Sequence, residues 1–365
     1  MLALLRSARV SSCCSLAVAL FASPVLAAEG PTVNVSINTV KMSMPGMPAM
    51  PALPPGIKLP PGVNMPGMMG MFQGRRSLTV SLATQGAAPD GATASMDLPD
   101  GLGVGTPASL DVRRPSKGRT GPGGAAGGGD MKVWLYWGCG DTVPAGQPKR
   151  IDMTSTMRRY MQQVNPRMGM AGDETFASYP SARDMMGSTI KADASAVGDY
   201  KLHTSYAGDA SFHVGADQDF LDAIELVSPQ QRPDLGSAIS LAWKSVPHAS
   251  GYQVMATGQK DDPNGGGKIM IMWFSSNEEP FQGEMLGAGD DAQRKALLSP
   301  DTTTCTVPAG ILQGVQGAIL MVMAHGHTRT TDGNPGVRVT NMSTTSMMLA
   351  APGGRRGGGG SPFGQ

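Results

Sequence analysis

The amino-acid sequence predicts an all-β protein with two β-sandwich domains. Segments such as residues 32–40 and 76–82 alternate apolar and polar side chains at a period of two, the pattern of a strand with one buried face. The 50 glycines and 29 prolines occupy 79 of the 365 positions, well above the roughly 12 per cent of average usage. Only residues 152–163 have the spacing of an amphipathic helix. These observations argue against a fold built on long helices.

We expect residues 1–27 to be a signal peptide. Arg6 and Arg9 provide the basic start, residues 10–22 the apolar stretch, and residues 25–27 a small-residue cleavage site. The apolar stretch has 13 residues, fewer than the ~20 that cross a bilayer as a helix. The sequence therefore predicts a protein exported to the periplasm or the extracellular space, with no transmembrane segment.

Four cysteines divide between the leader and the mature chain. Cys13 and Cys14 leave with the leader; an acylated Cys13, as in a lipoprotein, is an alternative that would place the apolar stretch after the cysteine. Cys139 and Cys305 remain, and two cysteines in an exported protein suggest one disulfide. Two buried free thiols that pack as small apolar groups are the other interpretation. A disulfide would connect the two domains.

The net charge gives no support for a nucleic-acid partner. The whole chain has 29 basic and 28 acidic residues, a formal net charge of +1. Removal of the leader takes away Arg6 and Arg9 and leaves 27 basic against 28 acidic residues, a net charge of −1. Binding to nucleic acid depends on a basic surface that neutralises phosphates. We therefore expect no nucleic-acid partner.

The first expected domain is β-rich and spans residues 28–218. Strands are predicted at residues 32–40, 76–82 and 200–214, where apolar and polar residues alternate. Residues 132–137 are the most aromatic run in the sequence. We expect this run to be a central strand of the first domain.

Two low-complexity insertions interrupt this domain. Residues 41–71 contain eight methionines, eight prolines and five glycines, a composition typical of an extended or polyproline II segment. Residues 113–130 are Gly-rich, with four basic residues at their start, and we expect a flexible loop. Residues 351–365 form a Gly-rich tail that we also expect to be disordered.

A family resemblance lies in residues 239–254. A Leu-x-Trp segment, a connector ending in Ala-x-Gly and a Tyr-x-Val segment follow one another there. This order resembles the B–C hairpin of fibronectin type III domains, in which the Trp and the apolar strand residues enter the core between two sheets. The matching residues are Leu241, Trp243, Val246, Ala249, Tyr252 and Val254.

The resemblance implies a seven-stranded Greek-key sandwich over residues 219–350. Such domains serve as spacers, adhesive modules and protein-binding modules, so the likeness implies a fold and no particular chemistry. Besides the B–C hairpin, we expect strands A, C′, E, F and G at residues 224–229, 268–274, 303–307, 318–324 and 337–348.

Regularly spaced methionines in the first insertion suggest a copper site. In polyproline II a three-residue step returns to the same face, and soft thioethers select Cu(I). Met-rich flexible segments of exported bacterial copper-handling proteins look similar. The alternative is a neutral low-complexity loop, because methionines are also scattered through the rest of the chain. The candidate ligands are Met44, Met47, Met50, Met65, Met68 and Met71.

Other candidate chemistry is sparse. His325 and His327 end a predicted strand and share one face, which suits either a metal ligand pair or exposed strand-end histidines. The sequence lacks the Gly-x-Ser-x-Gly, His-Glu-x-x-His and phosphate-loop motifs. We therefore expect a chain without catalytic activity, although the absence of a motif does not exclude an enzyme.

The sequence thus predicts an exported, non-enzymatic β-sandwich protein, a binding or envelope-associated module. Its expected partner is an unknown protein or an envelope polymer. One alternative is a periplasmic copper-binding protein that uses residues 41–71. Another is an enzyme with an unrecognised site between the two sandwiches.

Overall fold

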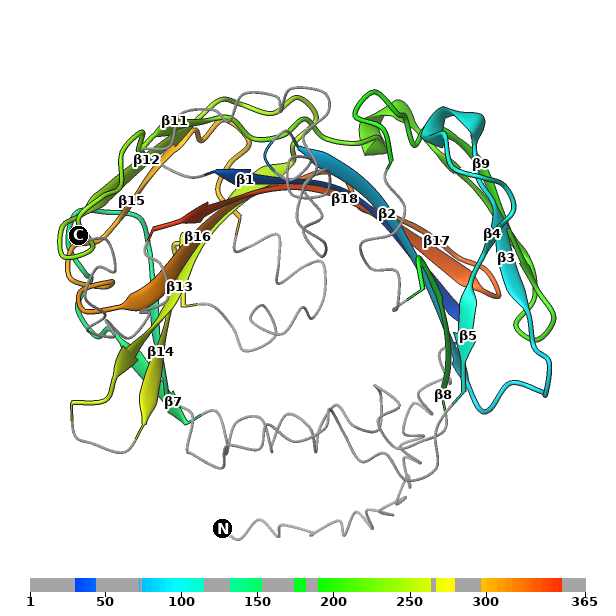
Figure 1. Ribbon diagram of the computed structural model, residues 1–365, viewed down its shortest axis with the longest axis horizontal. Helices are drawn as coiled ribbons and strands as arrows, with labels where there is room; N and C mark the ends of the chain where they lie inside the picture. Colours follow the sequence, from blue (N-terminus) through cyan, green and yellow to red (C-terminus); the bar gives the residue numbers. More distant parts are fainter. Residues whose placement is uncertain are drawn as a thin grey trace, which may run out of the picture.

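Strands dominate the structure. The computed structural model describes residues 30–43, 72, 74–114, 132–152, 174–181, 190–263, 267–279 and 297–349 (Figure 1). Two single-turn 3-10 helices, η1 (Asp100–Leu102) and η2 (Ala216–Gln218), interrupt the strands. The expected all-β class is confirmed. The leader, the expected helix beyond residue 152, most of both insertions and the C-terminal tail lie outside the described residues.

One large sheet of eleven strands runs through both halves of the chain and curves into an arch (Figure 1). Ten strands follow one another across it, and β17 (Arg329–Thr331) pairs with one of them, β18. In spatial order they are β5 (Asp111–Arg113), β8 (Glu174–Tyr179), β2 (Arg75–Gln85), β1 (Thr32–Ser43), β18 (Gly336–Met348), β16 (Gln316–His325), β13 (Gly251–Asp261), β14 (Lys268–Phe274), β6 (Lys132–Trp137) and β7 (Lys149–Asp152).

Two smaller sheets cover the convex side of the arch (Figure 1). One end is covered by four strands: β10 (Ala210–Val214), β9 (Gly198–Thr204), β3 (Ala94–Asp97) and β4 (Ala108–Ser109). The other end is covered by three strands: β11 (Leu226–Ser228), β12 (Ile239–Trp243) and β15 (Thr304–Val307).

A separate apolar core lies beneath each small sheet. Alternate residues of β1, such as Val35, pack with Tyr200 of β9 in the first core. Trp273 of β14 packs with Leu241 of β12 in the second. All four side chains are almost fully buried. Period-two alternation directs one face of each large-sheet strand into these cores, and the opposite set of side chains lines the concave face.

The large sheet crosses the boundary that the sequence suggested at residue 218. The first strand, β1, pairs in parallel with the last, β18, so that Val35 lies opposite Val339. We expected β6 in the first domain, but it pairs in parallel with β14, with Trp134 opposite Ile271. Alternation determines which face of a strand is buried, whereas the partner strand depends on contacts between distant segments.

Hydrogen bonds attach the connection between the two small sheets to the large sheet. Thr39 of β1 donates its hydroxyl to the carbonyl of Leu221 at 2.7 Å. Thr345 of β18 donates to the carbonyl of Ile224 at 2.9 Å. Both threonines are buried, so these bonds satisfy carbonyl groups of a chain segment that crosses the sheet without pairing as a strand.

Candidate functional site

The concave face of the large sheet faces away from both smaller sheets (Figure 1). It divides into two parts of different chemistry. Methionine and aromatic side chains occupy the part over β6, β13, β14 and β16. Hydroxyl and amide side chains occupy the part over β1, β2 and the first half of β18.

The methionine-rich part has a small buried cluster at its edge. Met321 of β16 lies directly opposite Met255 of β13, and Met323 follows on the same face of β16. This part of the face is therefore rich in thioethers, with polar neighbours such as Gln253, which lies opposite Met323. The buried cluster consists of Val133, Leu135, Ile151 and Phe274, against which Trp137, Met255, Met270 and Met272 pack.

The polar part is built from cross-strand rows of uncharged side chains. Ser36 of β1 lies between Thr79 of β2 and Thr340 of β18, and the Ser36 and Thr340 hydroxyl oxygens are 3.4 Å apart. In the next row Asn38 lies between Ser77 and Met342. These rows present hydrogen-bond donors and acceptors along a continuous surface.

A pocket of about 460 Å³ lies where the two parts meet. It is bounded by β1, β18, the end of β16 and the residues that follow β16. Arg338, His325 and His327 line it, and no acidic residue is among the described residues that do. The other lining residues are Ser36, Asn38, Ser250, Leu297, Gly326, Thr328, Thr340, Asn341 and Met342.

His325 is the unusual group of this pocket. It ends β16 and lies directly opposite Met342 of β18. Its Nε2 atom is buried and has no hydrogen-bond partner among the described residues. Burial lowers the pKa of the imidazole to about 4, because desolvation disfavours the cationic form. His325 is therefore neutral at pH 7, while His327 is exposed.

The backbone around His325 is held by Ser250. The Ser250 hydroxyl lies within hydrogen-bond distance of the carbonyls of His325, at 2.9 Å, and Gly326, at 2.8 Å. Gly326 donates its N–H to the carbonyl of Asn341 at 2.9 Å. A Cβ at position 326 would lie 2.0 Å from Asn341 Oδ1, so only glycine fits between the pocket and β18.

The other three histidines lie elsewhere. His203 Nε2 is 3.1 Å from a carboxylate oxygen of Asp97 on the four-stranded sheet, and this hydrogen bond raises the pKa of His203. His213 pairs with Asp199 at 2.8 Å. His248 occupies the turn between β12 and β13 and does not line the pocket. Among the described residues no group of three or more His, Cys, Asp or Glu side chains is placed to hold a metal ion.

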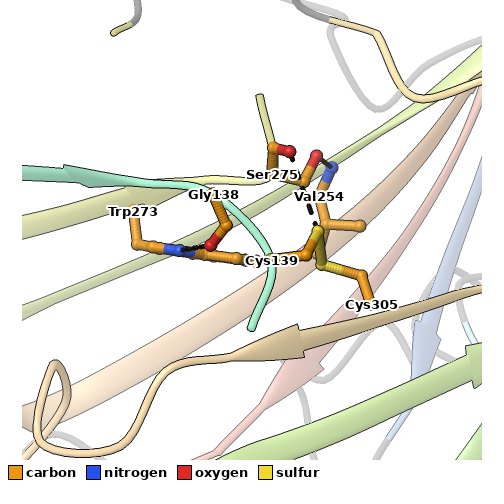
Figure 2. Close-up of a disulfide and its surroundings, with 6 residues drawn as sticks. All are labelled: Gly138, Cys139, Val254, Trp273, Ser275 and Cys305. Atoms are coloured by element: carbon orange, nitrogen blue, oxygen red, sulfur yellow. Dashed lines mark hydrogen bonds between the residues drawn. A yellow bond between two sulfur atoms is a disulfide. The ribbon is translucent and has the colours of Figure 1, made fainter. Parts of the chain in front are cut away.

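A disulfide joins Cys139 to Cys305 (Figure 2). Cys139 follows β6 of the large sheet and Cys305 lies on β15 of the three-stranded sheet. Beside the bond, Trp273 Nε1 donates to the carbonyl of Gly138 at 3.0 Å. The disulfide therefore links two layers around one core, because β6 belongs to the same half of the sheet as β14. From the sequence alone, the disulfide is expected to connect two separate domains, residues 28–218 and residues 219–350.

Only some of the residues that line the pocket could be identified from the sequence. The histidine pair was identified, but its neighbours Ser36, Asn38 and Arg338 come from strands whose pairing no local pattern reveals. The polar alternation of residues 34–38 was the available signal. The proposed copper ligands of the first insertion, Met44, Met47, Met50, Met65, Met68 and Met71, lie outside the described residues.

In the part of the chain that the structure describes, no helix has the length and apolarity needed to span a membrane. Comparison of the chain with protein-family models, with curated proteins and with solved structures found no match.

Proposed function

We propose that the protein is an exported, non-enzymatic binding module that holds an anionic polysaccharide of the cell envelope on the concave face of its large sheet. The observation that carries this proposal is the pocket at the centre of that face. Arg338 and two histidines line it, no acidic residue is among its described lining residues, and rows of hydroxyl and amide groups lead away from it.

Arg338 supplies the charge recognition. Its guanidinium is permanently cationic and presents donors in a geometry that suits carboxylate or phosphate groups. None of the described residues that line the pocket is acidic, so none of these side chains repels an anion. His327 is exposed beside it and adds further donors.

The rows of uncharged polar side chains supply the sugar recognition. Thr79, Ser36 and Thr340 form one row and Ser77 and Asn38 begin another. Hydroxyl and amide groups both donate and accept hydrogen bonds, as sugar hydroxyls require. A polymer that lies along the arch contacts several rows at once, which raises its affinity above that of a single sugar.

Two further features support the proposed export of the protein and the proposed fold of its second half. The basic, apolar and small-residue segments of residues 1–27 favour export. We also propose a fibronectin type III-like second half, with β11, β12 and β15 as strands A, B and E and with β18, β16, β13 and β14 as strands G, F, C and C′. The strand order within the two sheets supports this assignment.

The test is equilibrium binding of the mature protein to polygalacturonate, polyphosphate and neutral dextran at physiological salt. We expect binding to polygalacturonate that falls by about 10-fold or more in Arg338→Gln, because a charge-assisted hydrogen bond is lost. The matched control is Arg232→Gln, which removes the same charge from an exposed loop between β11 and β12.

Each polymer result has a defined meaning. Binding to polygalacturonate but not to dextran supports recognition of the anionic group, and weaker binding to polyphosphate supports the contribution of the sugar. Equal losses in the Arg338 and Arg232 variants would show non-specific charge attraction and contradict the proposal. No binding to any of the polymers would leave a partner protein as the ligand class to pursue.

A further inference from the structure

We propose that Met323, His325 and Met342 form a binding site for a soft monovalent metal ion, Cu(I). His325 and Met342 line the pocket, and Met323 is their neighbour on β16. The donors are two thioether sulfurs and the Nε2 atom of the imidazole. This proposal stands on the geometry of β16 and β18 and does not depend on the polysaccharide proposal.

Strand register brings the three side chains together. His325 and Met342 are directly opposite each other in the antiparallel pair of β16 and β18, where Cβ atoms are about 5 Å apart. Met323 precedes His325 by two residues, so it lies on the same face. It is the diagonal neighbour of Met342, at a distance of roughly 7 Å. Methionine has three flexible side-chain torsions, which allows both sulfurs to turn toward the imidazole.

The imidazole of His325 has a donor atom that the fold does not use. Its Nε2 atom is buried without a hydrogen-bond partner among the described residues, and such atoms are rare in folded proteins. In the tautomer with the proton on Nδ1, the Nε2 lone pair is free to coordinate a metal.

The donor set selects a soft ion. Thioethers are soft ligands that favour Cu(I), whereas Ca²⁺ and Mg²⁺ require oxygen ligands. No carboxylate is among the described residues that line the pocket, so these residues offer a hard cation no charged partner. Arg338 precedes Met342 by four residues on the same face of β18, about 13 Å away at ~3.3 Å per residue. The backbone of Arg338 is therefore well separated from that of Met342 along the strand.

The experiment uses Ag(I), a redox-inert probe of Cu(I) sites, titrated calorimetrically into the full mature chain in a chloride-free nitrate buffer. No reductant is required, which keeps the Cys139–Cys305 disulfide intact and prevents its thiolates from binding the metal. We expect one Ag(I) site whose affinity falls at least about 10-fold in Met342→Leu, since even loss of a group that only supports a ligand costs that much.

Two control variants separate this site from other methionines. Met321→Leu changes a thioether on the same face of β16, two residues further from His325, and retains the affinity. A second control changes Met44, Met47, Met50, Met65, Met68 and Met71 to Leu, and it also retains the site. Loss of the site in that six-fold variant, with retention in Met342→Leu, would overturn the proposal.

A second measurement avoids any dependence on variants. In protein labelled with ¹³C at the methionine methyl groups, saturating Ag(I) shifts the resonances of Met323 and Met342 and leaves that of Met348 unchanged. Met348 lies on the same face of β18, six residues from Met342. Unshifted resonances of Met323 and Met342 at saturation would also refute the site.

Discussion

Asn341 on β18 donates its side-chain N–H to the backbone carbonyl of Asp219 at 2.9 Å, across 122 residues of chain. The contact fixes the connection between the two small sheets to the central strand of the arch. It belongs to the same seam of buried polar groups as Thr39 and Thr345. This seam lies between the two apolar cores, and it couples them through one strand instead of through a domain interface.

Replacement of Asn341 by Ala should lower the free energy of unfolding by about 1–3 kcal/mol, because the carbonyl of Asp219 loses a buried hydrogen-bond partner. Asn34→Ala is the control: Asn34 lies on the concave face of β1, and its loss should cost less than about 0.5 kcal/mol. Urea unfolding of both variants measures the difference. Equal effects would show that the seam does not stabilise the fold.

Gly326→Ala should also destabilise the protein, by about 1–3 kcal/mol, because the new Cβ overlaps the side chain of Asn341. Gly105→Ala is the matched control, since a Cβ there meets nothing within 4 Å. In a double-mutant cycle, removal of the Asn341 side chain should relieve part of the cost of Gly326→Ala. Additive free-energy changes in the cycle would contradict the steric explanation.

Mature protein analysed without reductant should contain no alkylatable thiol, since Cys139 and Cys305 are bonded. The bond closes a loop with a sequence separation of 166 residues, and loss of such a constraint costs roughly 2–5 kcal/mol. A Cys139→Ser/Cys305→Ser variant should therefore unfold at lower urea concentration. Two alkylated thiols in the native, unreduced protein would refute the disulfide.

His325 should make the fold less stable in acid. Its pKa is about 4 in the folded state against 6.5 for the free side chain, so the unfolded chain binds the proton first as the pH falls. The stability that the lowered pKa of His325 gives the fold is complete above about pH 6.5 and is lost as the pH falls toward 4. The free energy of unfolding therefore decreases by about 2 kcal/mol between pH 7 and pH 5. The pKa of His203 is raised by Asp97, so protonation of His203 stabilises the folded protein as the pH falls.

Urea unfolding at pH 7 and pH 5 measures this dependence. His325→Gln should lose less stability between the two pH values than the parent protein, while His203→Gln should lose at least as much as the parent. A His325→Gln variant with the full acid loss would show that another group causes it.

Much of the strand content could be predicted from the sequence. Residues 132–137 and 268–274 are strands with those same ends in the structure, because an apolar run bounded by glycine or polar residues defines a short buried strand. The alternation of residues 337–348 likewise reappears as β18, which begins one residue earlier. Local patterns suffice for these elements.

Strand partners could not be predicted in the same way. The parallel pairing of β1 with β18 joins Ser36 to Thr340, 304 residues away, and no local pattern encodes such a contact. The pocket depends on this pairing, because Ser36, His325 and Arg338 come from three different strands. The sequence therefore pointed to the histidines without indicating the guanidinium beside them.

In the proposed function an anionic polymer binds on the concave face at Arg338. Arginine modification by phenylglyoxal, followed by mass spectrometry, with and without saturating polygalacturonate, tests this binding. We expect the polymer to slow modification of Arg338 and to leave Arg232, on the exposed loop between β11 and β12, unchanged. Modification of Arg338 at the same rate in the polymer-bound protein would show that the polymer does not bind at this residue.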